Sequence, residues 1–288
     1  MRWLWLSASF TRHVRGSGPP AAQAHPLFTF YLLFFISIIC GRWFAIRITF
    51  DLHLHSCLSP CGSGDNTPAN LAGMCALAGL DAVALTDHNT VGNCAAFCKA
   101  AELYGLVALP GMELTTLEEV HVVCLLPTLE AAEGFGREVY GRLPPFPNDV
   151  HIFGPQVLMD AEDGVLGEEG RMLAGATDIG VYQVKELVAR YGGVCWPAHI
   201  DRPSFSLLSN LGLWDPGLGF AFAEVSRNCP PGFLDRGDLM GLHTVTASDA
   251  HYLDQIMDPC QSVELPERSA AALMAWLREP DFGGYERF

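Results

Sequence analysis

Short strand-like runs alternate with helical patterns from residue 46 onward, and this alternation limits the possible folds more than any other feature. Residues 46–55 read IRITFDLHLH, with an apolar side chain at every second position, and residues 81–87 and 106–116 are further strand-like runs. The first helical pattern begins with Thr67 and Pro68, residue types favoured at the N-cap and at the first helical position. Strands that alternate with helices of this length predict an α/β protein built from βα units around a parallel sheet or barrel.

The length of 288 residues suits one principal domain, which we expect to span residues 47–288. The strand and helix rhythm changes between about residues 127 and 193, where turn-rich and glycine-containing stretches occur. We interpret this part as a segment inserted into the scaffold that shapes the functional site, and not as a separate domain.

The first 46 residues form an atypical extension. They contain arginines but no acidic residue, and residues 27–40 are a largely apolar stretch of 14 residues. A membrane-spanning helix needs about 20 such residues, and no small-residue cleavage motif follows the stretch. Three interpretations stay open: sequence upstream of the true start, a hydrophobic membrane anchor, and a cleaved signal peptide.

Charge and cysteine content restrict the class of protein. The net charge is −15, and the part after residue 50 has 12 basic and 32 acidic side chains. Such acidity argues against a protein whose main task is to coat nucleic acid or an anionic membrane. The ten cysteines do not follow the pattern of a small disulfide-framed protein. We therefore expect reduced thiols and a cytoplasmic protein, or a membrane-tethered one if residues 27–40 are an anchor.

Side chains that bind metal ions occur at or near the ends of successive strand-like runs. His53 and His55 are two apart in a strand, so they lie on one face of it. The carboxyl ends of the strands in a βα barrel or doubly wound sheet face one side, so distant residues are expected to meet there. The later members of the set are Asp87, His88, Glu113, His121, His199, Asp249 and His251. Each alone has an ordinary structural explanation, but their joint occurrence predicts a metal site.

The ordered motifs HxH, TDHN, GxE, a downstream His, PAHID and SDAH resemble those of the PHP (polymerase and histidinol phosphatase) superfamily of metal-dependent phosphoesterases, over residues 48 to about 255. The resemblance implies a distorted (βα)7 barrel that holds two or three divalent metal ions at the strand ends. It also implies, position by position, that the ligands are His53, His55, His88, Glu113, His121, His199, Asp249 and His251. A further ligand is expected from the loop after HxH, where Asp65 is the candidate and Cys57 and Cys61 are alternatives. Asp87 is expected to orient His88 or a neighbour.

Shells of mixed histidine and carboxylate ligands suit Mn²⁺, Zn²⁺ or Fe²⁺ better than Mg²⁺. A pair of such ions supplies a metal-bridging hydroxide that attacks phosphorus. We expect Glu113 to bridge two ions, and Glu113, His199 and Asp249 to form the catalytic centre. Arg202 and Arg227 follow strand-like runs and are the candidates for binding the substrate phosphate, because a guanidinium fits phosphate oxygens. The alternative for both is a solvated or ion-paired loop arginine.

The expected function is that of a stand-alone hydrolase, either a phosphatase or a 5′-3′ exonuclease, without a polymerase module. Its substrate would be a small phosphomonoester, such as a nucleotide or sugar phosphate, or the 5′ end of a short oligonucleotide. The alternative is a non-catalytic metal-binding or regulatory barrel. No obligate protein partner is evident, and we expect membrane contact only if residues 27–40 are an anchor.

Overall fold

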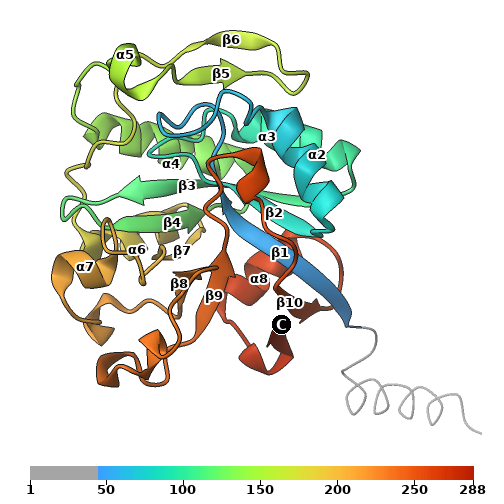
Figure 1. The fold of residues 1–288 in the computed structure, drawn as a ribbon, viewed down its shortest axis with the longest axis vertical. Coiled ribbons are helices and arrows are strands. Elements are labelled where there is room, and N and C mark those ends of the chain that lie inside the picture. Colours follow the sequence, from blue (N-terminus) through green and yellow to red (C-terminus); the bar gives the residue numbers. More distant parts are fainter. Residues whose placement is uncertain (1–44) are drawn as a thin grey trace, which may run out of the picture. The chain divides into compact units, whose positions relative to one another are not determined.

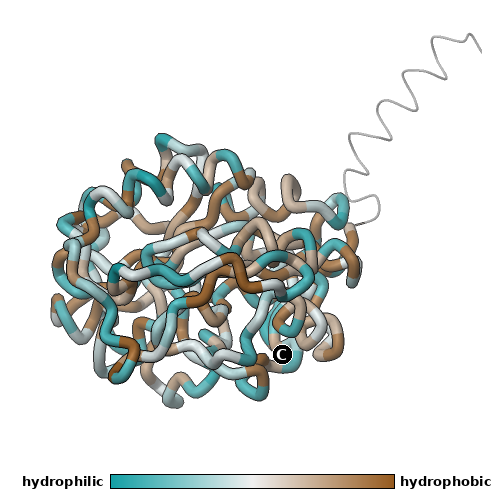
Figure 2. Tube along the Cα trace, turned by 90° about the horizontal axis from the view of Figure 1, so that it is seen from above, coloured by the Kyte–Doolittle hydropathy of each residue, from teal (hydrophilic) through white to brown (hydrophobic). Residues whose placement is uncertain are grey.

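The computed structural model describes residues 45–288 (Figure 1). The apolar stretch at 27–40 and the rest of the predicted extension up to residue 44 lie outside the described residues. In the described part, no helix has the length and apolar character needed to cross a membrane. In a view from above, strongly hydrophobic segments cross the middle of the molecule, and hydrophilic segments are frequent along its outline (Figure 2).

A seven-stranded sheet in the order β11-β10-β1-β2-β3-β4-β7 forms the scaffold. Strands β1, β2 and β3 are parallel neighbours, β4 is antiparallel to both β3 and β7, and β10 is antiparallel to both β1 and β11. The strands are β1 (Ile46–Leu54), β2 (Ala82–Leu85), β3 (Val107–Thr115), β4 (His121–Leu125), β7 (Val194–Pro197), β10 (Gln261–Leu265) and β11 (Tyr285–Arg287).

A second, parallel pair of strands lies between the far parts of this sheet. Strand β8 (Ala223–Ser226) contacts β7, and β9 (Thr244–Ala247) contacts β1. Because this pair bridges the two ends of the run from β1 to β7, the sheet curls into a distorted barrel. The predicted α/β class and distorted barrel are therefore confirmed.

Helices cover the outside of the curled sheet (Figure 1). The longer ones are α2 (Pro68–Ala78), α3 (Cys94–Leu103), α4 (Leu129–Arg142), α6 (Val181–Arg190) and α8 (Ala270–Arg278), and α7 (Leu207–Leu211) is short. Helix α2 begins as predicted: the Thr67 hydroxyl accepts from the backbone N–H of Asn70, and Pro68 is the first helical residue. Gly79 ends it with a φ of 85°, a conformation that costs glycine little.

The interior of the barrel is filled by one apolar cluster, which includes Phe50, Trp196 and Phe222. Trp196 is fully buried, and its ring centroid lies 5.0 Å from that of Phe222. Val107 and Val194, the first residues of β3 and β7, pack against this cluster. Helix α8 contributes to it and contacts β3, β7 and β10, so one end of the barrel is closed by apolar packing.

His53 and His55, at the end of β1, face the barrel because β1 contains one residue more than the matching part of β2. Its pairing with β2 changes register between Asp51 and Leu54, as in a β-bulge, which re-aims the side chains beyond it. Phe50 and Leu52 belong to the interior cluster, whereas Leu54, with which the new register begins, packs with the helices α2 and α3. With an uninterrupted alternation, the two histidines would have faced away from the barrel interior.

Within the segment predicted as an insertion, around residues 127–193, helices α4 and α6 pack on the main core. The part that departs from the strand and helix alternation is narrower, from about residue 144 to residue 177. It contains the short helix α5 (Val150–Phe153) and the hairpin of β5 (Val157–Met159) and β6 (Val165–Glu168). Figure 1 shows these elements together at the top of the molecule.

Leu71 and Leu77 offer a matched test of this packing, because both lie on α2 but their exposed fractions are 0% and 80%. We expect Leu71→Ala to lower the free energy of unfolding by about 2–5 kcal/mol, since it leaves a cavity in the core. Leu77→Ala should change it by less than about 0.5 kcal/mol. Urea unfolding followed by circular dichroism measures both values, and equal effects would contradict the placement of α2.

Candidate metal centre

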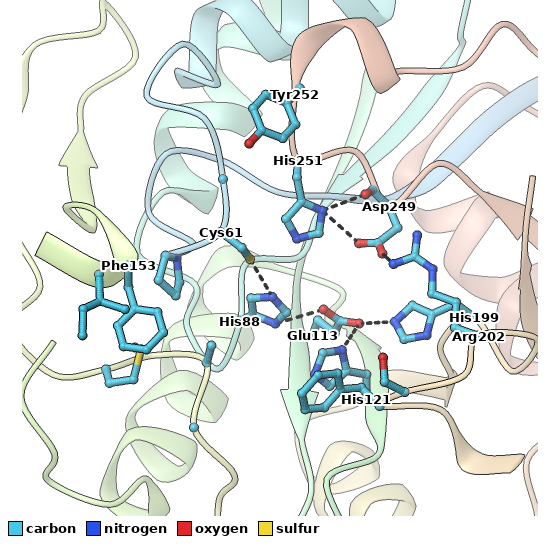
Figure 3. A pocket seen from close by; sticks show the side chains of 18 residues that line it. Cys61, His88, Glu113, His121, Phe153, His199, Arg202, Asp249, His251 and Tyr252 are labelled. Carbon is cyan, nitrogen blue, oxygen red and sulfur yellow. Dashed lines mark hydrogen bonds and ion pairs between the residues drawn. The ribbon is translucent and has the colours of Figure 1, made fainter. Parts of the chain in front are cut away.

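Eight of the predicted ligands lie together at one end of the barrel, and six of them line a pocket with a volume of about 750 Å³ (Figure 3). Three are on strands and five follow them, and the bulge in β1 and the strand ends bring them together. They are His53 on β1 and His55 directly after it, His88 after β2, Glu113 on β3, His121 on β4, His199 after β7, and Asp249 and His251 after β9. All are buried except His251, which is partly exposed.

The carboxylate of Glu113 is the centre of this cluster, with five imidazoles around it. Its Oε1 lies 2.9 Å from Nδ1 of His121, 3.1 Å from Nε2 of His199 and 3.3 Å from Nε2 of His53. Its Oε2 lies 3.0 Å from Nδ1 of His88 and 3.3 Å from Nε2 of His55. The two oxygens of Glu113 therefore face different imidazoles.

Asp249 is the second carboxylate of the cluster. Its Oδ1 lies 3.0 Å from Nε2 of His55 and 3.3 Å from Nε2 of His53, and its Oδ2 lies 2.5 Å from the guanidinium of Arg202. The backbone φ values of Asp249 and His199 are 50° and 29°, in a region that residues other than glycine rarely adopt. Strained backbone of this kind collects at functional sites, where the surrounding structure enforces it.

The donor set fits divalent metal ions. The ring nitrogens His53 Nε2 and His55 Nε2 face each other at 3.1 Å, an arrangement that needs a proton or a cation between them. Glu113 Oε2 and Asp249 Oδ1 are buried and lie 3.0 Å from His88 Nδ1 and His55 Nε2, respectively, so a cation held by these nitrogens would also have a carboxylate oxygen within reach. Three overlapping groups bring ligand atoms within 4.8 Å of one another: His53, His55, Glu113 and Asp249; His55, His88 and His251; and His88, Glu113 and His121.

The electrostatics of the cluster follow from burial and from its two carboxylates. Burial alone lowers the pKa of a histidine, but hydrogen bonds to Asp249 and Glu113 raise the pKa of His55 to about 9. Burial also lowers the pKa of His88, but the negative charge of Glu113 outweighs it, and the pKa is raised to about 9. In His121 burial prevails and lowers the pKa to about 4. The surrounding imidazoles hold the pKa of Glu113 well below its usual range despite burial.

The side chains behind the ligands fix the ring orientations. Ser59 Oγ lies 3.0 Å from Nδ1 of His55 and donates to Asp87 Oδ1 at 2.7 Å. Asp87 also accepts from the backbone and hydroxyl of Ser56 at 2.7 and 2.6 Å. Asp87 is therefore positioned to orient His55 through Ser59. The Nδ1 of His251 lies 2.8 Å from the backbone oxygen of Asp249.

Glu224, on β8, is a site residue that the sequence interpretation missed. Its two carboxylate oxygens lie 2.9 and 3.1 Å from Nδ1 of His53, and it is buried. A proton on Nδ1 directs the lone pair of Nε2 toward Glu113 and Asp249, as in the carboxylate–histidine pairs behind metal ligands. The available signal was an acidic residue inside the apolar run FAFAEV.

The structure does not bring Asp65 into the cluster. Its side chain is exposed, and it belongs to none of the three groups of close ligand atoms. Cys57 is buried with its sulfur 3.6 Å from that of Met159. Cys61 lines the pocket with its sulfur 3.2 Å from Nε2 of His88, although it too is outside the three groups.

The two predicted phosphate-binding arginines are placed differently. Arg202 lines the main pocket and pairs with Asp249. Arg227 lines an adjoining pocket that Arg202 and Asp249 also border, and its guanidinium donates to the backbone oxygen of Gln255 at 3.3 Å. Of the two, Arg202 is the one that contacts the ligand cluster.

Comparisons with known proteins identify the fold. The model of the PHP domain family matches residues 51–141, whereas no curated protein matches the chain. The lesion-specific endonuclease PfuEndoQ from Pyrococcus furiosus has a TM-score of 0.59 at 16% identity, and an endonuclease Q complex with a 27-mer duplex substrate has 0.60 at 17%. Each of these alignments covers 84% of this chain and 58% of the other, so the chain spans less than two thirds of those proteins.

A presumed metal-dependent phosphoesterase from Bifidobacterium adolescentis has a TM-score of 0.50 at 20% identity, with coverage of 72% of this chain and 89% of that one. At such identities the likeness shows the fold alone. Together with the family match, it confirms the predicted PHP resemblance and the distorted PHP barrel.

Replacing the carboxylate behind His53 should weaken metal binding. We expect Glu224→Gln to lower the affinity for Mn²⁺ or Zn²⁺ about 10- to 100-fold, because the amide holds the ring less firmly and leaves His53 a poorer ligand. Competition with a chromophoric chelator measures the affinity. Glu102→Gln, at an exposed position on α3, is the control, and equal affinities in both variants would contradict the role of Glu224.

Metal uptake should release protons at neutral pH. A histidine whose pKa is raised keeps its proton until the pH passes that value, so in the metal-free protein His55 and His88 are protonated at pH 7. An incoming cation displaces these protons, and affinity should therefore rise with pH toward about 9. Calorimetric titration of Mn²⁺ in two buffers of different ionisation enthalpy counts the protons. Binding enthalpies that do not depend on the buffer would contradict this expectation.

Proposed function

Since residues 51–141 match the model of the PHP domain family, we propose that the chain is a metal-dependent phosphoesterase that hydrolyses a small phosphomonoester or the 5′ end of a short oligonucleotide. The observation that carries this proposal is the Glu113 carboxylate, buried among five imidazoles at the floor of a solvent-accessible pocket. A purely structural histidine cluster has no need of a pocket above it. The proposal therefore assigns the cluster to chemistry on a ligand that enters the pocket.

Two or three divalent ions would be held by the eight clustered ligands, with Mn²⁺, Zn²⁺ or Fe²⁺ favoured by the histidine-rich shell. When bound, such ions supply Lewis acidity and activate water as a nucleophile at neutral pH. Glu113 would bridge two of them, and Asp65 is left out of the shell because its side chain is exposed and belongs to none of the groups of close ligand atoms.

The remaining roles fall to residues that face the pocket. Glu113, His199 and Asp249 line the pocket and would form the catalytic centre. Arg202 would bind the phosphate oxygens, since its guanidinium lines the pocket and is partly exposed even though it pairs with Asp249. Arg227 would contact a more distant part of the substrate from the adjoining pocket. A guanidinium provides the planar donors that phosphate oxygens accept.

The likeness to endonuclease Q bears on the choice of substrate. Two of the named proteins are endonucleases, and one of them was solved with a 27-mer duplex substrate that has an abasic lesion at the active site; this favours a nucleic-acid or nucleotide substrate here. The acidity of this chain favours a short strand or a mononucleotide over a long polyanion. A cytoplasmic location is part of the proposal and is supported by the described cysteines, all of which are free thiols.

Assays on the full chain test the proposal. We expect the protein loaded with Mn²⁺ or Zn²⁺ to cleave p-nitrophenyl phosphate, mononucleotides or 5′-phosphorylated oligonucleotides. His53→Ala should reduce kcat/KM by about 1,000-fold or more, because the whole rate enhancement depends on the metal cluster. His151→Ala, at an exposed histidine, is the matched control and should leave kcat/KM unchanged.

One combination of results favours the non-catalytic metal-binding or regulatory barrel instead. In that case the protein would bind metal but cleave none of these esters with any of the ions, and His53→Ala would change the thermal stability alone.

A further inference from the structure

The pocket has one apolar wall that the metal chemistry does not use. Its side chains come from the segment of residues 144–177, and they are Ile152, Phe153, Met172 and Ala174, with Gly175 beside them. None of these side chains has a polar group other than the thioether sulfur of Met172. In Figure 3, Phe153 lies across the ligand cluster from Arg202.

These apolar side chains do not serve the core. Helix α5 has no buried residue, and the exposed fractions of Ile152 and Phe153 are 71% and 46%. Leaving large apolar side chains in water forgoes the free energy of burying them, and exposed apolar patches beside a pocket mark binding surfaces. Tyr252, which also lines the pocket and is exposed, adds a second aromatic ring at the rim.

Hydrogen bonds hold the wall in place. The backbone of Met172 donates to Phe146 at 2.9 Å, and that of Asn148 donates to Gly170 at 2.8 Å. The side chain of Asn148 donates to the backbone oxygen of Gly154, directly after α5, at 2.8 Å. Asn89, between β2 and α3, donates to the backbone oxygens of Leu173 and Gly175 at 2.6 and 2.9 Å. The apolar surface is therefore presented by a braced segment, which lowers the entropic cost of binding a ligand against it.

We propose that this wall, formed by Ile152, Phe153 and Met172, binds the nucleobase of the substrate while its phosphate lies at the metal cluster. The inference rests on the proposed phosphoesterase function and selects nucleotides, or the terminal nucleotide of a strand, over sugar phosphates. A sugar phosphate has hydroxyl groups that need hydrogen-bond partners, and the wall offers none from its side chains. A base presents a flat π-face, which stacks on aromatic and apolar side chains whatever its sequence.

The decisive comparison is between adenosine 5′-monophosphate and ribose 5-phosphate, which share the phosphate and the sugar and differ in the base. In the metal-loaded full chain we expect the nucleotide to have the higher kcat/KM by about 10- to 100-fold, the range expected for one stacked base. Phe153→Ala should remove most of this preference by raising KM for the nucleotide, while the values for ribose 5-phosphate stay unchanged. Phe153→Tyr should restore it.

Phe146→Ala is the matched control, since Phe146 belongs to the same segment and is 67% exposed but does not line the pocket. It should leave both substrates unaffected. Equal kcat/KM for the two substrates in the wild type, or an equal loss for both in Phe153→Ala, would overturn the base-binding wall while leaving the phosphoesterase intact.

Calorimetric binding of the same two compounds to the metal-loaded protein keeps the inference separable from the proposed function. If neither these two compounds nor the esters named under the proposed function are cleaved, the phosphoesterase proposal fails, and the affinities alone decide whether the wall binds a base. Tighter binding of the nucleotide that is lost in Phe153→Ala would support the wall. Equal affinities for the nucleotide and for ribose 5-phosphate would refute it.

Discussion

The burial of one carboxylate, that of Glu113, is the constraint on which the arrangement of the site depends. A buried carboxylate must be compensated by nearby positive charge or hydrogen-bond donors, and here five imidazoles from different parts of the barrel supply them. Because imidazole exchanges a proton for a metal ion readily, the same packing that compensates Glu113 in the metal-free protein provides a ligand shell for cations.

The scaffold meets this constraint through its strand ends and through one local irregularity. Parallel strands deliver His88 and Glu113 to the same rim without special features, since carboxyl ends converge there. The histidines of β1 require the extra residue between Asp51 and Leu54 to face the barrel. The apolar cluster around Trp196 fills the rest of the barrel interior. The candidate metal ligands therefore lie at the open end, and the apolar cluster stabilises the barrel.

The sequence was sufficient for what depends on periodicity and strand order, and insufficient for what depends on loop paths. The meeting of the later strand-end residues at one rim could be predicted because convergence follows from topology, whereas the inward direction of His53 and His55 depends on the extra residue in β1. Asp65 could not be placed, because its loop folds through contacts such as the Cys57 backbone with Asn66 and Val157, which no local pattern encodes. Glu224 was missed for the opposite reason: a single acid in an apolar strand shows its partner only when β8 is placed beside His53.

The two halves of the pocket also differ in whether strands or loops position their residues. The metal-binding half is built from strand ends, which the barrel holds in fixed positions, whereas the apolar wall belongs to a segment outside the barrel and tied to it by Asn89 and Asn93. A change in residues 144–177 can therefore alter what lies against Phe153 without moving Glu113 or Asp249. Under the proposed function, the reaction type would be a property of the barrel, and the choice among phosphate esters would be a property of the segment of residues 144–177.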